Sequence, residues 1–147
     1  MKNVIVFIII VLLFCGINLL PIKKFDIANL FSFCGAEVYL SDDDFVEGYV
    51  SVKNGTGVIV YCDVSSISYL QQNYEVCGFT IKVNKLDVDE VLTKIKAKDV
   101  ERVMGYDYGV SPFFNKYIKT NNKTVNFQCV QSEDCVLLGV PLLLGSY

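Results

Sequence analysis

The hydrophobic pattern divides the chain into two unequal parts. Residues 4–20 are almost entirely aliphatic or aromatic and carry no charge, whereas short apolar and polar runs alternate from residue 36 onwards. As a helix, the first run would reach roughly 26 Å, close to the hydrocarbon core of about 30 Å. We therefore predict an N-terminal hydrophobic helix within residues 1–24, acting as a signal peptide or an uncleaved membrane anchor. A buried core helix is the remaining interpretation, and it suits a small domain poorly.

The pattern after residue 24 predicts a short linker followed by one domain. Residues 25–35 show no helical stripe and are predicted to be a linker, and residues 36–147 are predicted to form a globular domain. Asn54 and Gly55 are the strongest hairpin signal, because both central residues of a type I′ turn need positive φ. Strand-like runs cover residues 37–40, 45–52, 57–62, 76–83, 100–108, 114–119, 124–130 and 135–138.

One of these strands indicates how the sheet is covered. In residues 76–83 the alternation predicts that Cys77, Phe79, Ile81 and Val83 point inward and that the residues between them face solvent. A strand with one buried and one wet face is typical of an antiparallel sheet covered on one side.

Two segments carry a helical period instead. Apolar side chains recur every three or four positions in residues 63–74 and again in residues 88–95. Asp87, with Glu90 three positions later, matches a capping box at the start of the second segment. We therefore predict an α+β fold, an antiparallel β-sheet with two helices packed on one face, preceded by the N-terminal hydrophobic helix.

The amino-acid composition excludes several kinds of catalytic and binding site. The chain has no histidine and no tryptophan, which excludes Ser-His-Asp and Cys-His catalysis and histidine-ligated zinc. Three of its thirteen basic residues precede residue 25 and all sixteen acids follow it, which leaves ten basic residues and a net charge near −6 for the rest. Such an acidic domain disfavours nucleic acid, whose binding depends on Lys and Arg neutralising phosphates. We expect no cofactor and no metal ion.

The N-terminal segment also bears on location. Lys2 precedes it and Lys23 and Lys24 follow it, so the positive-inside rule barely distinguishes the two orientations. Because such segments usually carry the rest of their chain outward, we expect a single-pass protein of the cell membrane with an extracytoplasmic domain, or a secreted domain. The N-terminal helix would provide the contact with the membrane, and a protein partner is left open.

Four of the six cysteines fall within the strands and turns of the predicted domain: Cys62, Cys77, Cys129 and Cys135. An even set in an exported domain permits two disulfides, and four cysteines allow three connectivities. Proximity in sequence favours Cys62–Cys77 and Cys129–Cys135, with four buried free thiols as the alternative. A thiol–disulfide exchange role is disfavoured, because Cys129 and Cys135 are spaced more widely than a redox pair.

Two functions remain open. The chain shows no clustered nucleophile and base, which favours a non-catalytic interaction domain, membrane-tethered or secreted. The alternative is a carboxylate-based hydrolase of the cell envelope, in which two acids flank the bond. Its candidate acids are Asp42, Asp43, Asp44, Glu47 and Asp107.

The C-terminal third carries a family resemblance. Residues 103–147 contain a strand that leads into a Tyr-rich loop, then Thr-Val-Asn-Phe-Gln at 124–128, and Gly139-Val140-Pro141 before a terminal Tyr147. These features resemble the C-terminal part of a family of small exported bacterial proteins that is associated with sporulation and has a TATA-box-binding-protein-like fold. The resemblance implies a curved antiparallel sheet with helices on one side, and it implies no enzymatic site.

Overall fold

The structure, a computed structural model, describes residues 25–41, 45–120 and 122–143. The predicted N-terminal hydrophobic helix lies outside these ranges, and so do Asp42, Asp43 and Asp44. Within the described ranges, no helix is long and apolar enough to cross a membrane.

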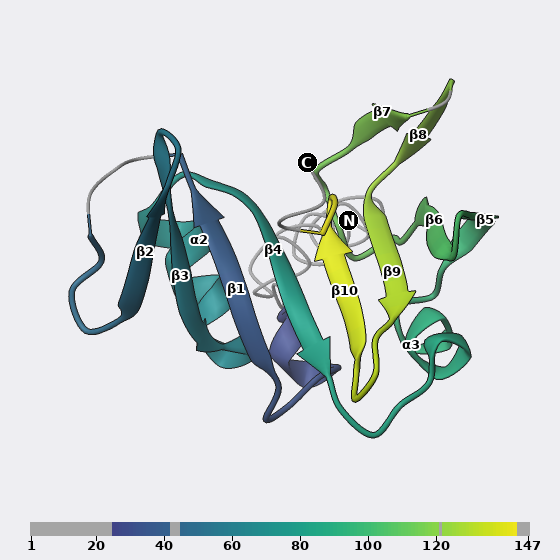
Figure 1. Ribbon diagram of the computed structural model, residues 1–147, viewed down its shortest axis with the longest axis horizontal. Helices are drawn as coiled ribbons and strands as arrows, with labels where there is room; N and C mark the ends of the chain where they lie inside the picture. Colours follow the sequence, from purple (N-terminus) through teal and green to yellow (C-terminus); the bar gives the residue numbers. More distant parts are fainter. Residues whose placement is uncertain (1–24, 42–44, 121, 144–147) are drawn as a thin grey trace, which may run out of the picture.

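Ten strands, two α-helices and two 3₁₀ helices make up the described part of the chain (Figure 1). In chain order they are η1 (Ile27–Asn29), β1 (Gly35–Leu40), β2 (Val50–Asn54), β3 (Gly57–Asp63), η2 (Val64–Ser66), α2 (Ile67–Asn73), β4 (Val76–Val83), α3 (Val88–Lys94), β5 (Lys98–Val103), β6 (Tyr106–Val110), β7 (Ile118–Thr120), β8 (Lys123–Val125), β9 (Phe127–Gln131) and β10 (Val136–Val140).

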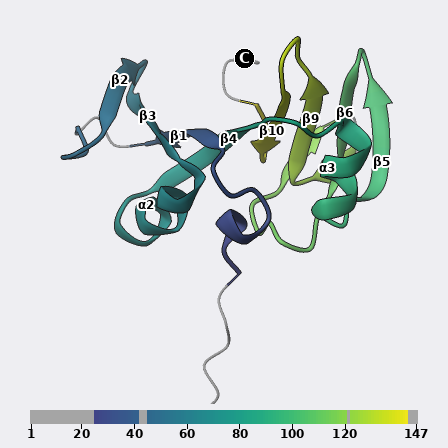
Figure 2. The same ribbon diagram turned by 90° about the horizontal axis from the view of Figure 1, so that it is seen from below.

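Eight of the strands form one antiparallel sheet in the order β2-β3-β1-β4-β10-β9-β6-β5, and β7 and β8 form a separate hairpin. Strands β1 to β4 build one half of the sheet, and β5, β6, β9 and β10 build the other. The halves join where β4 pairs with β10. Helices α2 and α3 lie on the same face, one under each half, with η1 between them (Figure 2). The predicted α+β class with an antiparallel sheet is confirmed.

Strand alternation separates a covered face from an open face. On β1 the side chains of Ala36, Val38 and Leu40 are buried in the core cluster that also contains Ile67 and Leu70 of α2. Glu37 points the other way, and Tyr61 of β3 is its direct partner in the register. Because opposite residues of an antiparallel pair share a face, Tyr61 lies on the open face, where it is 42 % exposed.

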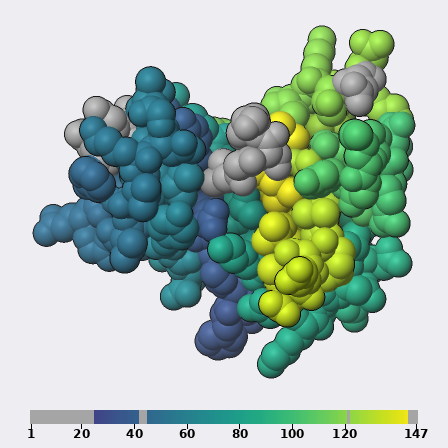
Figure 3. Space-filling view, viewed as in Figure 1, coloured from purple at the N-terminus to yellow at the C-terminus, as the bar shows by residue number. Residues whose placement is uncertain are grey.

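The last described residues cover part of this open face. The amide of Leu143 donates to Oε1 of Gln128 at 3.0 Å, and Nε2 of Gln128 donates to the hydroxyl of Tyr108 at 2.9 Å. Gly139 leaves room for this return, since a Cβ there would lie 2.2 Å from the backbone nitrogen of Leu143. In the space-filling view from the side of the strands (Figure 3), this yellow C-terminal part lies near the middle of the molecule.

The segment predicted as a linker instead packs into the core. Ile27, Phe31 and Cys34 are all buried. Asp26 caps η1 by accepting a hydrogen bond from the amide of Ala28, and the carbonyl of Cys34 accepts from Val64. Three apolar residues of this segment therefore join the core, although only Ile27–Asn29 forms a helix, a short 3₁₀ turn.

The structure confirms the capping box and the first hairpin, and it divides one predicted strand in two. The capping box is confirmed, with Glu90 N–H to Asp87 Oδ1 at 2.8 Å and Asp87 N–H to Glu90 Oε2 at 2.9 Å. The β2–β3 hairpin is also present, although Asn54 pairs with Gly57, so that Gly55 and Thr56 form the turn. Residues 100–108, predicted as one strand, instead form the hairpin β5–β6. Its turn at Met104 and Gly105 has φ values of 52° and 86°.

Strand β4 spans the predicted residues, but one side chain faces the other way. Phe79, Ile81 and Val83 are buried as predicted, whereas Cys77 is exposed and Val76 is buried in its place. The register between β1 and β4 shifts between Tyr39 and Leu40. A bulge of this kind adds one residue to a strand and reverses the side-chain alternation beyond it.

Candidate functional site

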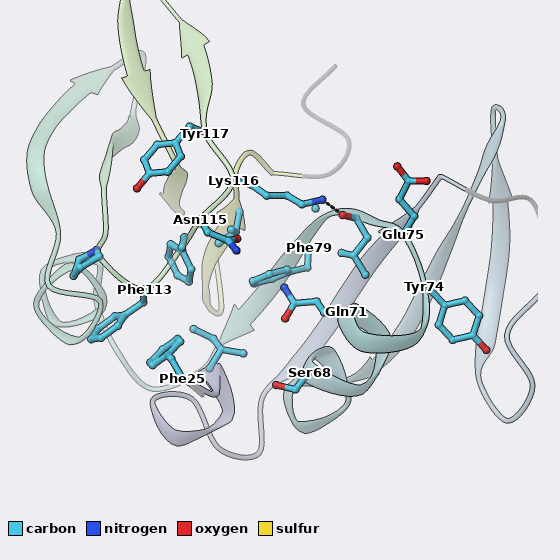
Figure 4. Close-up of a pocket in the computed structure, with 16 residues that line it drawn as sticks. Phe25, Ser68, Gln71, Tyr74, Glu75, Phe79, Phe113, Asn115, Lys116 and Tyr117 are labelled. Atoms are coloured by element: carbon cyan, nitrogen blue, oxygen red, sulfur yellow. Dashed lines mark hydrogen bonds between the residues drawn. The ribbon is translucent and has the colours of Figure 1, made fainter. Parts of the chain in front are cut away.

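A large hollow lies on the helix side, between the two halves of the molecule (Figure 4). We call it the aromatic groove, a cavity of about 660 Å³ whose walls include Phe25, Phe79, Phe113, Phe114, Lys116 and Tyr117. One wall comes from η1 and α2, and the other comes from the loop that links β6 to β7. Central strand β4 supplies the floor. The volume of the aromatic groove falls within the range of about 300–1,000 Å³ that is typical of ligand pockets.

Aromatic pairs give the groove a preformed apolar surface. The rings of Phe25 and Phe113 stack with centroids 4.3 Å apart and an interplanar angle of 6°. Phe79 on β4 and Phe114 meet edge to face, with centroids 6.3 Å apart. Both arrangements are favourable for aromatic rings. The first pair joins the start of the described chain to the loop after β6, so it ties the two walls together.

Asn126 holds the loop wall in place from beneath. Its side chain is fully buried, and its Oδ1 accepts a hydrogen bond from the amide of Ser111 at 2.7 Å. Its Nδ2 donates to the carbonyls of Ser111 and Phe114, both at 2.8 Å. The hydroxyl of Ser111 donates to the carbonyl of Ile95 and accepts from the amide of Phe113. Two buried polar side chains therefore set the backbone that carries Phe113 and Phe114.

Polar groups are few and lie at defined places along the groove. The ammonium of Lys116 reaches across and donates to the carbonyl of Val76, at the first residue of β4 (Figure 4). Gln71 and Ser68 of α2 approach from one side and Asn115 from the other. An apolar cleft with a small number of oriented polar groups is the usual form of a binding site.

The candidate hydrolase acids that the structure describes do not meet. Glu47 is exposed in the loop before edge strand β2, whereas Asp107 is buried in β6. Five strands of the sheet lie between β2 and β6. Glycosidase carboxyl groups stand about 5–9.5 Å apart on either side of the bond, so these two acids cannot act as a pair.

Asp107 has a structural partner instead. Both of its oxygens accept from Arg102, at 2.9 Å from Nε and 2.8 Å from Nη2. This bond to Asp107 raises the pKa of the Arg102 guanidinium, which stays charged. A bidentate Arg–carboxylate pair satisfies a buried acid without giving it a catalytic role.

The five described cysteines are free thiols, and neither predicted disulfide is formed. Strand β1 lies between the strands that carry Cys62 and Cys77. Two strand spacings amount to about 9.6 Å, beyond the Cα–Cα limit of about 6.8 Å for a disulfide. Cys129 faces the core beside Leu138, whereas alternation from Val136 puts Cys135 on the open face.

Burial makes two of these thiols poor nucleophiles. Burial, with a further contribution from the charge of Asp107, raises the pKa of Cys129 to about 12. Burial and then the charge of Asp63 raise the pKa of Cys62 to about 11. Since the thiolate is the reactive form, neither residue offers a redox or catalytic centre. Among the described residues there is also no group of three or more His, Cys, Asp or Glu that could hold a metal ion.

Sequence reasoning assigned none of the groove residues to a binding site, and it named Phe79 only as a core residue. Tyr and Phe in strand-like runs usually pack a core, which is the interpretation that their pattern favours. The available signal was the set of aromatic residues at 113, 114 and 117, placed after Pro112 and therefore in a loop. Comparison with protein families, curated proteins and solved structures found no match for this chain.

Proposed function

We propose that this chain is a non-catalytic interaction domain of a bacterial cell, tethered to the membrane or secreted, and that it binds an apolar group in the aromatic groove. The observation that carries the proposal is the preformed wall of stacked rings, Phe25 on Phe113, beside an open cavity. Aromatic side chains of restricted mobility provide contact area at low entropic cost. The N-terminal apolar segment supports the membrane location, and the family resemblance alone supports a role in sporulation or the envelope.

The structure of the groove suits binding better than turnover. Lys116, its cation, donates to a backbone carbonyl. The candidate acids that can be placed lie elsewhere, with Asp107 bound to Arg102. A general acid–base site needs titratable groups within reach of one reacting atom. The lining of the groove holds a single carboxylate, Glu75, and otherwise consists mainly of rings, aliphatic groups and amides.

Two tyrosines allow a matched test of the groove. Tyr117 lines it and is 52 % exposed, while Tyr69 on α2 is 51 % exposed and lies outside it. A photo-crosslinking amino acid is placed at each position of the full chain, which is then irradiated in its native membranes. Adducts at position 117 and none at position 69 are expected. Equal labelling at both positions, or none at either, would contradict a binding role for the groove.

Location is tested separately by adding protease to intact cells. We expect the domain to be digested without lysis if it lies outside the cytoplasm. Protection until the membrane is opened would refute the proposed location and leave the binding test untouched.

A further inference from the structure

The start of the described chain places the groove close to the membrane, if the proposed anchor holds. Phe25 is both the first described residue and part of the groove wall, near η1 (Figure 4). The apolar run ends at Leu20, only five residues earlier. Five fully extended residues reach at most about 18 Å, and the headgroup layer takes up about 5–7 Å of that length. The foot of the groove therefore lies at or near the lipid headgroups.

We infer that the aromatic groove binds the acyl chain of a lipid from the bilayer that anchors the protein. Phe25, Phe79, Phe113 and Phe114 supply an apolar surface for hydrocarbon. The lining residues Phe25 and Tyr117 are 39 % and 52 % exposed, so the groove meets solvent and a headgroup can remain in water while the chain enters. This inference rests on the proposed membrane tether and names the ligand of the proposed binding site.

Two cations at or beside the groove favour an anionic headgroup. Lys116 lines it and donates to the carbonyl of Val76, and no carboxylate pairs with it among the ion pairs of the described residues. Lys96 lies outside the lining, with its ammonium 5.6 Å from the centroid of the Phe113 ring. The lining contains one carboxylate, that of Glu75, so a lipid phosphate or carboxylate near Lys116 and Lys96 would balance the second positive charge.

Tethering also favours a lipid over a peptide. A lipid beside the anchor is present at the high local concentration of the bilayer, while a soluble peptide has to be recruited. On the side of β10, strand β4 is paired from Phe79 to Val83, and the carbonyl of Val76 beyond that pairing accepts from Lys116. The unpaired part of this edge, residues 76–78, is short for an extended peptide to extend the sheet.

Because the sequence contains no tryptophan, a single introduced tryptophan accounts for all of the tryptophan emission of a variant. The full chain is reconstituted into vesicles of equal parts phosphatidylcholine and phosphatidylglycerol, with or without bromine near the middle of one acyl chain. Phe113→Trp reports on the groove, and Tyr117→Trp repeats the measurement at a half-exposed side chain that tolerates a larger ring. Tyr61→Trp reports on the open face. Phe14→Trp reports on insertion of the N-terminal segment.

We expect both groove reporters and Phe14→Trp to lose most of their emission in brominated vesicles, and Tyr61→Trp to keep it. If Phe14→Trp is quenched and the two groove reporters are not, the lipid site is refuted and the membrane anchor is supported. This result is expected when a protein segment fills the groove. Equal quenching of the groove reporters and Tyr61→Trp would also overturn it, because the whole domain would then lie in lipid. Unquenched emission from Phe14→Trp in the brominated vesicles would refute both the anchor and the lipid site.

Discussion

Asn126→Ala is the sharpest test of how the groove wall is built. The substitution removes three hydrogen bonds and leaves the Ser111 amide and the Phe114 carbonyl unpaired, whereas the Ser111 carbonyl keeps the amide of Phe114 at 3.3 Å. Each buried group left unpaired costs about 1–3 kcal/mol. Pro112 and Asn115 in the same loop are exposed, so water can reach part of the site. We therefore expect the low end of the sum for these two groups, a loss of about 2–3 kcal/mol of folding free energy.

Urea unfolding of the full chain in mild detergent, followed by far-UV circular dichroism, measures this loss. With a slope of about 1–3 kcal/mol per molar urea, a loss of this size should lower the midpoint by roughly 1 M. Amide hydrogen exchange at Ser111 and Phe113 should accelerate, because the loop opens before the sheet does.

Asn115→Ala is the matched control, since it removes the same side chain from an exposed position in the same loop. It should change stability by less than about 0.5 kcal/mol. The reasoning fails if Asn126→Ala unfolds at the wild-type urea concentration, or if Asn115→Ala costs as much.

Gly139, Cys129 and Arg102 offer three further tests. Gly139→Ala puts a Cβ 2.2 Å from the nitrogen of Leu143 and should accelerate amide exchange there, whereas Gly35→Ala meets nothing within 4 Å and should not. The folded pKa of Cys129, about 12, exceeds the usual 9.0, so the unfolded chain loses this proton first. The contribution of the Cys129 thiol to stability is complete below pH 9.0 and falls above that pH by up to about 1.4 kcal/mol per pH unit. The urea midpoint should therefore decrease as the pH rises above 9.0. In Cys129→Ala this decrease should be smaller. Arg102→Ala leaves the buried Asp107 carboxylate without its bidentate donor and should lower the urea midpoint more than Lys123→Ala, which breaks the pair with Glu101 at an exposed site. Equal midpoints for the last two variants would contradict the role given to Arg102.

Predictions from the sequence succeed where neighbours along the chain determine the outcome. The capping box depends on Asp87 and Glu90, three residues apart, and the structure shows both of its bonds. The alternation of Phe79, Ile81 and Val83 likewise reports directly which face is buried. A period of two or a fixed spacing is sufficient in such cases.

The same patterns fail where a distant strand intervenes. The alternation alone predicts that Cys77 points inward, and the register shift against β1 reverses it. Met104 and Gly105 turn the chain between β5 and β6, although Met is an unusual residue at positive φ. In both places the local sequence is ordinary, and the pairing partner decides the conformation.

The groove depends almost entirely on such distant pairings. Phe25 stacks on Phe113, and Asn126 fixes the backbone at Ser111 and Phe114. Each of these residues has a plain local interpretation, as a linker aromatic, a loop aromatic or a polar residue within a strand. Only the antiparallel sheet, with β4 and β10 joined at its centre, brings them to one place. A binding surface assembled across the junction of two half-sheets therefore leaves no short motif in the sequence, and its lining can be read only from the assembled fold.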